Sequence, residues 1–272
     1  MKGTEYPYAS LDDFLISNPL TVDGQLDDGW GAIFPVKGRE IEAAILFADI
    51  SSFARRTFQL TPTETLIFVN NFLAWISAEA LRKYPGIVDK YIGDEVMVVF
   101  SAEFGSKDPF ADALMTARWM AENDVLDYCP HMGIGTGQVT VGFVGTPLKY
   151  NCTVYGMPVA LAKRCATVPP KVPGGASIIF PAELWKGRGF DEFFPPRDPL
   201  GAGRAPRDLP QPWQMLPPRR VDLKNMPSID ILEIANKEVH DPSQTAEDRA
   251  RDSLRALLKA GLYRPPRRVT SF

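Results

Sequence analysis

The sequence predicts an α+β fold in which helices pack on a largely antiparallel sheet. Apolar runs of strand length alternate along the chain with segments whose apolar residues recur at helical spacing. Two strand-like runs, Ile87–Ile92 and Glu95–Phe100, are separated only by the tight pair Gly93-Asp94 and are expected to form a hairpin. Because a hairpin pairs its strands antiparallel, the sheet is not expected to consist of parallel crossover units alone.

The first strand expected in the main domain is Ile41–Asp49, an apolar run that ends in an acidic residue. A long helix is expected to open at Thr61, with Pro62 in the first turn, where the missing N–H of proline costs nothing. Apolar residues recur along this helix every three or four positions, and Pro85-Gly86 ends it.

The second half of the chain continues the alternation of helices and strands. We expect a helix from Asp108 to about Leu126, a glycine-punctuated hairpin over His131–Gly145, a helix over Gly156–Thr167, and strands at Ser177–Phe180, Val221–Lys224 and Ile229–Glu233. Residues 186–220 differ from this pattern because they hold eight prolines between Pro195 and Pro218, which disfavours any regular element.

The domain organisation follows from these patterns. Residues 1–38 are broken by prolines and turn signals and are expected to be an irregular N-terminal arm. Residues 39–236 form the main domain, with the proline-rich stretch 186–220 as an insertion in it. Residues 237–272 are a tail, helical over Thr245–Ala260.

The composition is that of a soluble globular protein with 272 residues and a net charge of −3. A pI near 5.6 argues against nucleic-acid binding, which normally requires a basic surface. The three cysteines, Cys129, Cys152 and Cys165, fit neither a disulfide framework nor a zinc site. No secretory signal or membrane-spanning run is visible, so a cytoplasmic location without membrane contact is expected.

Asp49 and Asp94 are the first candidates for a functional site. Asp49 ends an apolar strand and Asp94 lies at a hairpin tip, so both are expected at the edge of the sheet. Carboxylates there can converge on hard divalent cations, which prefer oxygen ligands. The alternative is structural, with Asp49 capping the following turn and Asp94 serving as an ordinary turn residue.

The segment that follows Asp49 is a candidate phosphate-binding loop. In Ile50-Ser51-Ser52-Phe53, small residues precede a helix, so backbone amides could approach phosphate oxygens. A simple serine N-cap is the alternative. The glycine run Gly133–Gly137 is not read as a dinucleotide fingerprint because a strand rather than a helix follows it. These glycines are expected to permit a tight hairpin and a close backbone contact.

Taken together, five segments resemble the catalytic domain of class III adenylate and guanylate cyclases over about residues 40–235. They occur in the order and spacing of that family: Phe47–Ile50 with Phe53, Val88–Met97, Gly133–Val139 with Gly142 and Val144-Gly145, Thr153–Gly156 through Arg164, and Val221–Lys224 with Ile229–Ile234. The resemblance implies a ferredoxin-like core and a head-to-tail homodimer with active sites at the interface.

The resemblance also implies the activity. A nucleoside triphosphate would be converted into its 3′,5′-cyclic monophosphate and pyrophosphate with two divalent cations, Mn²⁺ or Mg²⁺. Asp49, Asp94 and the backbone carbonyl of Ile50 would hold the cations, and Ile50, Ser51, Ser52 and Phe53 would contact the substrate.

The partner subunit would complete each site in the family arrangement. Lys90 and Thr153 occupy the base-reading positions, Arg164 the transition-state arginine and Lys224 the triphosphate-binding lysine. Surface exposure of Lys90 and an ordinary strand role for Thr153 are the structural alternatives.

One position departs from the family pattern and bears on the substrate. The ribose-contacting asparagine of the family is Ala160 here, which indicates a remodelled nucleoside pocket. With the proline-rich insertion and no visible attached sensor, the chain looks like bacterial antiphage cyclases that make cUMP or cCMP, signals that act on a separate effector protein. Conversion of UTP to cUMP is expected. An adenylate cyclase, or a catalytically silent nucleotide-binding regulator, remains the alternative.

Overall fold

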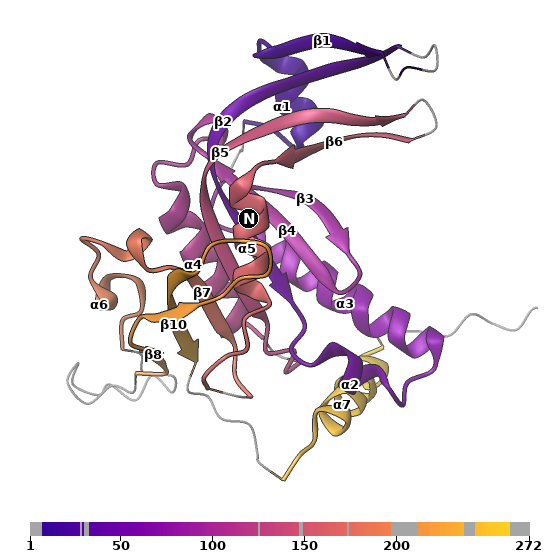
Figure 1. Cartoon of the computed structure of the whole chain (residues 1–272). Coiled ribbons are helices and arrows are strands. Elements are labelled where there is room, and N and C mark those ends of the chain that lie inside the picture. Colours follow the sequence, from indigo (N-terminus) through magenta and orange to yellow (C-terminus); the bar gives the residue numbers. More distant parts are fainter. Residues whose placement is uncertain are drawn as a thin grey trace, which may run out of the picture.

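A ten-stranded sheet is the centre of the computed structural model, which describes residues 7–27, 29, 33–124, 126–146, 149–172, 174–196, 211–236 and 243–261. Its main path runs β3-β4-β2-β5-β7-β10-β8 (Figure 1). These strands are β3 (Gly86–Ile92), β4 (Glu95–Ser101), β2 (Ile33–Asp49), β5 (His131–Thr146), β7 (Ser177–Pro181), β10 (Ile229–Asn236) and β8 (Trp213–Met215). Only β5 and β7 pair parallel among the described strands. The predicted α+β class is confirmed.

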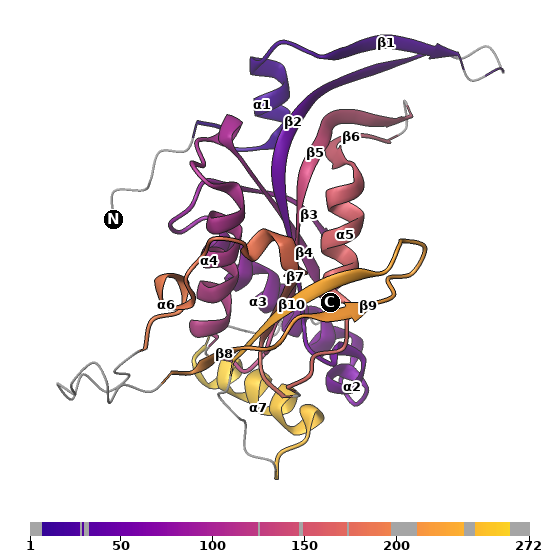
Figure 2. The ribbon, with the colours of Figure 1, turned by 60° about the vertical axis from the view of Figure 1, so that its left-hand side comes forward.

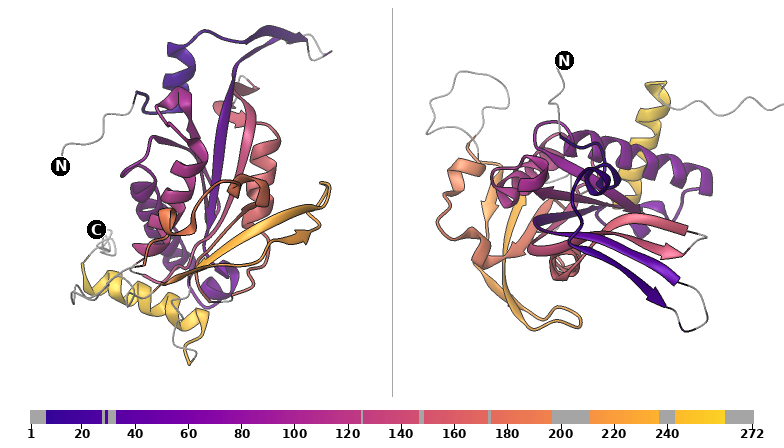
Figure 3. Two further views of the ribbon diagram at one scale, coloured as in Figure 1. Left: turned by 90° about the vertical axis from the view of Figure 1, so that its left-hand side faces the viewer. Right: turned by 90° about the horizontal axis from the view of Figure 1, so that it is seen from above.

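Two long hairpins extend the sheet beyond the helices. Strand β1 (Val22–Asp27) pairs with the first part of β2, and β6 (Lys149–Tyr155) pairs with the last part of β5. Both hairpins project from the body of the domain in two perpendicular views (Figure 3). The predicted β3–β4 hairpin also forms, with Gly93 and Asp94 in its turn.

Helices cover both faces of the sheet (Figure 2). On one face lie α3 (Pro62–Ala80) and α4 (Pro109–Glu122), which bury Phe68, Phe72 and Leu114 with the alternate residues of β2 and β4. On the other lie α1 (Leu11–Ser17) and α5 (Met157–Ala166). The predicted start of α3 is confirmed, because Thr61 and Glu64 form a reciprocal capping box.

Helix α5 lies unusually close to strand β5, and glycines make this possible. A Cβ added to Gly133 would lie 2.1 Å from the carbonyl oxygen of Ala162, and one added to Gly135 would lie 2.5 Å from that of Pro158. The predicted close backbone contact is therefore confirmed. The predicted hairpin over 131–145 is wrong: this segment is one strand, because its glycines admit a helix rather than turn the chain.

The C-terminal helix α7 (Ala246–Lys259) packs on α2 (Phe53–Thr57) and α3 (Figure 2). It has its own capping box, formed by Thr245 and Asp248. The predicted tail helix is thus confirmed. No described helix has both the length and the apolar character needed to cross a bilayer.

Three predicted irregular or extended segments need correction. The part of 1–38 that the structure describes contains α1, β1 and the start of β2, because Phe14 and Leu11 pack on Phe104 and the sheet. Residues 186–220 include helix α6 (Phe190–Phe193), β8 and β9 (Arg219–Val221), while residues 197–210 lie outside the described part. The strand expected over 221–224 ends at Val221, where β9 stops pairing with β10.

Candidate active site

Asp49 and Asp94 lie at the same end of two neighbouring strands. Asp49 is the last residue of β2, and its partner in the β2–β4 register is Glu95. Asp94 lies in the turn directly before Glu95. The predicted convergence of the two aspartates at one edge of the sheet is therefore observed.

The carboxylate of Asp49 lacks a compensating partner. Its Oδ1 atom is buried and accepts no hydrogen bond. Burial, followed by the nearby carboxylates of Glu95 and Asp94, raises the pKa of Asp49 to about 8, while Lys163 lowers it. Burial also raises the pKa of Asp94. An uncompensated buried carboxylate beside a second one suits a bound cation, so these residues fit a divalent metal.

Lys163 supplies a positive charge at this end of the sheet. Its ammonium forms an ion pair with Glu95 and lies 5.7 Å from the ring centroid of Phe47. The lysine comes from α5, on the opposite side of the strands from α3. Sequence reasoning missed Lys163 and Glu95, and only knowledge of how α5 crosses the sheet could have found them.

The loop after Asp49 enters α2 through a left-handed residue. Ser52 adopts a left-handed backbone conformation with φ of 55° and gives α2 no side-chain cap, so the serine N-cap alternative is wrong. Ile50 and Ser51 are buried. The buried side chain of Arg56 holds the loop by donating to the carbonyl oxygen of Ser51 at 2.7 Å and to that of Asp127 at 2.5 Å.

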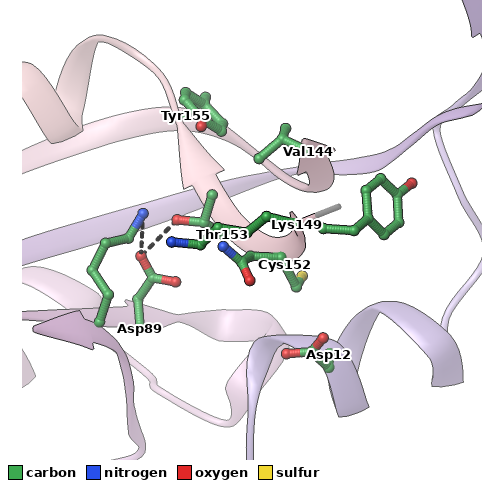
Figure 4. Close-up of a pocket in the computed structure, with 10 residues that line it drawn as sticks. Asp12, Asp89, Val144, Lys149, Cys152, Thr153 and Tyr155 are labelled. Carbon is green, nitrogen blue, oxygen red and sulfur yellow. Dashed lines mark hydrogen bonds and ion pairs between the residues drawn. The ribbon is translucent and has the colours of Figure 1, made fainter. Parts of the chain in front are cut away.

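The predicted base-reading residues lie in a cavity away from the two aspartates (Figure 4). It has a volume of about 520 Å³, in the range of small-molecule sites, and Lys90, Thr153, Asp12, Lys149 and Tyr155 are among its lining residues. Thr153 is 3% exposed and lines this cavity. Lys90 retains a partly exposed side chain with its ammonium at the cavity.

Sequence reasoning did not identify Asp89, which links these two residues. Thr153 Oγ1 donates to Asp89 Oδ2 at 2.7 Å, and Lys90 Nζ lies 3.3 Å from the same oxygen. Burial raises the pKa of Asp89, whereas the Thr153 hydroxyl and the Lys90 charge lower it. The signal in the sequence that could have identified Asp89 is its position directly before Lys90, the predicted base-reading lysine.

Arg164 and Lys224 come together in another cavity, of about 490 Å³. Arg164 belongs to α5 and Lys224 to the turn after β9. Arg219 also lines this cavity, although it forms an ion pair with Glu233 at 3.1 Å. Ala160 lies exposed on α5. The predicted residues thus form three groups in one chain: the two aspartates, the base-reading pair and the cationic pair.

Solved structures share this fold. The adenylyl cyclase CyaB from Pseudomonas aeruginosa superposes with a TM-score of 0.55 and 20% identity, covering 76% of this chain and 98% of that one. The guanylyl cyclase Cya2 superposes with a TM-score of 0.53 and 20% identity, covering 76% of this chain and 97% of that one. A bacterial light-regulated adenylyl cyclase superposes with a TM-score of 0.54 and 22% identity, covering 80% of this chain and 58% of that one. The fold is that of a nucleotidyl cyclase catalytic domain.

Sequence relatives match only part of the chain. An uncharacterised protein of Mycobacterium tuberculosis H37Rv is 29% identical over 140 residues, which are 50% of this chain and 26% of the relative. A second is 30% identical over 139 residues, 50% of this chain and 24% of the relative. The match thus spans about a quarter of the length of these curated relatives. No family model matches the chain.

Proposed function

We propose that this chain is a nucleotidyl cyclase that converts a nucleoside triphosphate into a 3′,5′-cyclic nucleotide and pyrophosphate. The observation that carries the proposal is the convergence of Asp49 and Asp94 on a cyclase fold, with a buried Asp49 oxygen that has no partner. In the reaction, the ribose 3′-oxygen attacks the α-phosphorus and the bond to the β-phosphate oxygen breaks.

The chain would hold two cations, Mn²⁺ or Mg²⁺, through Asp49, Asp94 and the carbonyl of Ile50. Bound cations would activate the 3′-hydroxyl and offset the charge of the leaving pyrophosphate. Within the described residues no three His, Cys, Asp or Glu side chains group as metal ligands, so substrate oxygens would supply further ligands. The backbone of Ile50, Ser51, Ser52 and Phe53 would orient the phosphates.

The remaining roles belong to the two cationic groups. Arg164 would stabilise charge on the pentacoordinate phosphorus, and Lys224 would bind the triphosphate. Because no described cavity contains both of these and the aspartates, we propose a head-to-tail homodimer in which each nucleotide lies between the metal residues of one subunit and the cationic residues of the other.

For the substrate we propose UTP, with Lys90 and Thr153 reading the uracil edge. The product cUMP would act in the cytoplasm on a separate effector protein during phage infection. The antiphage role rests only on the resemblance to antiphage cyclases. An adenylate cyclase remains the second candidate, because CyaB shares the fold.

The test is incubation of the purified protein with each of the four nucleoside triphosphates and Mn²⁺, followed by mass spectrometry of the products. Asp49→Asn and Asp94→Asn should each lower the rate of cyclisation by about 100-fold or more, because each removes a negative ligand from the cations. Circular dichroism would check that both variants fold. Substantial turnover by either folded variant would exclude the metal assignment. A preference of the wild-type protein for ATP would exclude UTP as its main substrate.

A further inference from the structure

The end of the sheet that holds Asp49 carries a third carboxylate, on Glu95. Asp49 is opposite Glu95 in the register of β2 with β4, so both side chains lie on the same face of the sheet. Phe47, two residues before Asp49, packs on this face in the cluster that includes Ala162 of α5. Asp49 and Glu95 therefore lie on the face that α5 covers, and Asp94 lies in the turn beside them.

Lys163 of α5 contacts this group of carboxylates directly. Its ammonium forms an ion pair with Glu95 Oε1 and lies 5.7 Å from the ring centroid of Phe47. The lysine side chain is 33% exposed and that of Glu95 is 16% exposed, so solvent screens the pair only in part. Glu95 Oε2 is buried and accepts no hydrogen bond from the described residues. Lys163 is thus the partner that the structure gives to Glu95.

The charges at this end of the sheet do not balance without a bound cation. The carboxylates of Asp49, Asp94 and Glu95 lie near one ammonium, which leaves two negative charges in excess when all are ionised. Lys163 also acts beyond its own ion pair: burial and Glu95 raise the pKa of Asp49 and of Asp94, whereas Lys163 lowers both. A charge added or removed here therefore changes the attraction of the two aspartates for a divalent cation.

Building on the proposed function, we propose that Lys163 sets the metal affinity of its own subunit by neutralising Glu95, so that only the charges of Asp49 and Asp94 attract the cations. Consecutive residues of a helix lie about 100° apart, and the neighbouring Arg164 lines a different cavity. Helix α5 would thus serve two sites. Lys163 acts on the metal residues of its own chain, and Arg164 acts on the nucleotide at the aspartates of the partner subunit.

The test is the binding of Mn²⁺ to the full chain without nucleotide, measured by electron paramagnetic resonance of the free ion. Lys163→Met should lower the dissociation constant for Mn²⁺ by about 10-fold, because an opposing positive charge is lost. Protons compete for the same carboxylates, but a proton carries half the charge of Mn²⁺ and gains less from this loss. Lys163→Arg keeps the charge and should bind Mn²⁺ as the wild-type protein does.

A double substitution separates the charge of Lys163 from its packing. Glu95→Gln removes a negative charge and should raise the dissociation constant for Mn²⁺ by about 10-fold. Glu95→Gln combined with Lys163→Met restores the net charge of the wild-type site, and its Mn²⁺ affinity should return to within about 3-fold of the wild-type value. Lys186 is exposed and follows the end of β7 that is remote from Asp49, so Lys186→Met should leave the affinity unchanged.

Each result decides between the possible roles of these residues. An unchanged Mn²⁺ affinity in folded Lys163→Met overturns the inference. If Lys163→Met does not fold, the double variant decides: an affinity as weak as that of Glu95→Gln would make Glu95 a metal ligand and overturn the inference. A wild-type protein that binds no Mn²⁺ overturns the metal site and the inference together. A protein that shows these charge effects but cyclises no nucleotide supports the inference and overturns the proposed function.

Discussion

The carboxylate of Asp49 combines three properties that a structural aspartate rarely has together. It is largely buried, one of its oxygens has no partner, and two further carboxylates lie near it. Lys163 offsets part of this negative charge, although it is already paired with Glu95. A protein tolerates such a group when a ligand supplies the missing positive charge, and it loses stability when that ligand is absent.

This gives a prediction for the metal-free protein. Near neutral pH, Asp49→Asn should raise the free energy of unfolding of the metal-free protein by about 1–3 kcal/mol, because the wild-type protein must protonate or bury a carboxylate whose pKa folding raises to about 8. Mn²⁺ should raise the melting temperature of the wild-type protein but not that of the variant. Thermal unfolding with and without Mn²⁺ measures both effects.

Asp230→Asn is the matched control for this experiment. Asp230 is 59% exposed and lies 3.6 Å from Arg220, so neutralising it should leave both melting temperatures nearly unchanged. Equal stabilisation of the wild-type protein and Asp49→Asn by Mn²⁺ would contradict the assignment of Asp49 as a metal ligand.

At the scale of elements, the loop after Asp49 depends on helices far away in the sequence. Arg56 of α2 reaches the carbonyl of Asp127, and the carboxylate of Asp127 forms an ion pair with Arg249 of α7 at 2.7 Å. Ser253 of α7 also donates to the carbonyl of Leu126. The position of α7 is thereby linked through Arg56 to the backbone of Ser51.

Arg56→Met tests this link. The substitution keeps an apolar stem but removes both hydrogen bonds, so two carbonyl groups lose their donor. We expect a loss of about 2–3 kcal/mol in stability. We also expect a higher concentration of Mn²⁺ and of nucleoside triphosphate for half-maximal rate, because the loop no longer holds the Ser52 conformation.

The neighbouring Arg55→Met provides the comparison. Arg55 is 73% exposed and lies 3.6 Å from Glu247, so its loss should change neither stability nor the metal requirement. A folded Arg56→Met protein with wild-type metal and substrate dependence would show that the loop holds its shape without this residue.

At the scale of the whole molecule, the site residues occupy separate regions of one chain. The aspartates lie at the ends of β2 and the β3–β4 hairpin, and the cationic pair lies between α5 and the β9–β10 turn. A shared site between two subunits accounts for this separation. A shared site also predicts that a substitution in the aspartates and a substitution in the cationic pair affect contributions from different subunits to each site.

Mixing two inactive variants tests the shared site. Asp49→Asn and Arg164→Ala should each be inactive alone, but a heterodimer would place both lesions at one interface and leave the other intact. With random exchange of subunits, about a quarter of the wild-type rate should return. Native mass spectrometry would establish the exchange. Exchange without any recovered activity would contradict the dimeric site.

How far the sequence predicts this structure depends on the range of the interactions. The strand ends at Asp49 and Asp94 follow from local apolar patterns and a turn signal, and the structure places both as expected. The close backbone contact predicted for the glycines of 131–145 forms, but the hairpin predicted there does not, because a turn and a close helix contact favour the same residue type. These glycines are required because α5 packs closely against β5, and α5 follows later in the chain.

Asp89 and Arg56 could not be predicted for a related reason. Strand alternation places Asp89 on the face opposite to Lys90, and only the pairing with β4 reveals the bulge. Arg56 looks like a second surface arginine beside Arg55, and its target carbonyl on Asp127 lies 71 residues away. Both residues are defined by contacts between segments, and a local pattern carries no information on these.

The bulge in β3 has a consequence for how such a protein could evolve. Val88 and Lys90 already face consecutive residues of β4, so losing the single codon for Asp89 would leave every other strand pair in register. Thr153 would lose the acceptor for its hydroxyl, whereas Asp49 and Asp94 would keep their places. The polar groups that line the cavity around Thr153 would then change without a new pocket or a rebuilt core. The deletion of one residue would separate the evolution of that cavity from the evolution of the two aspartates.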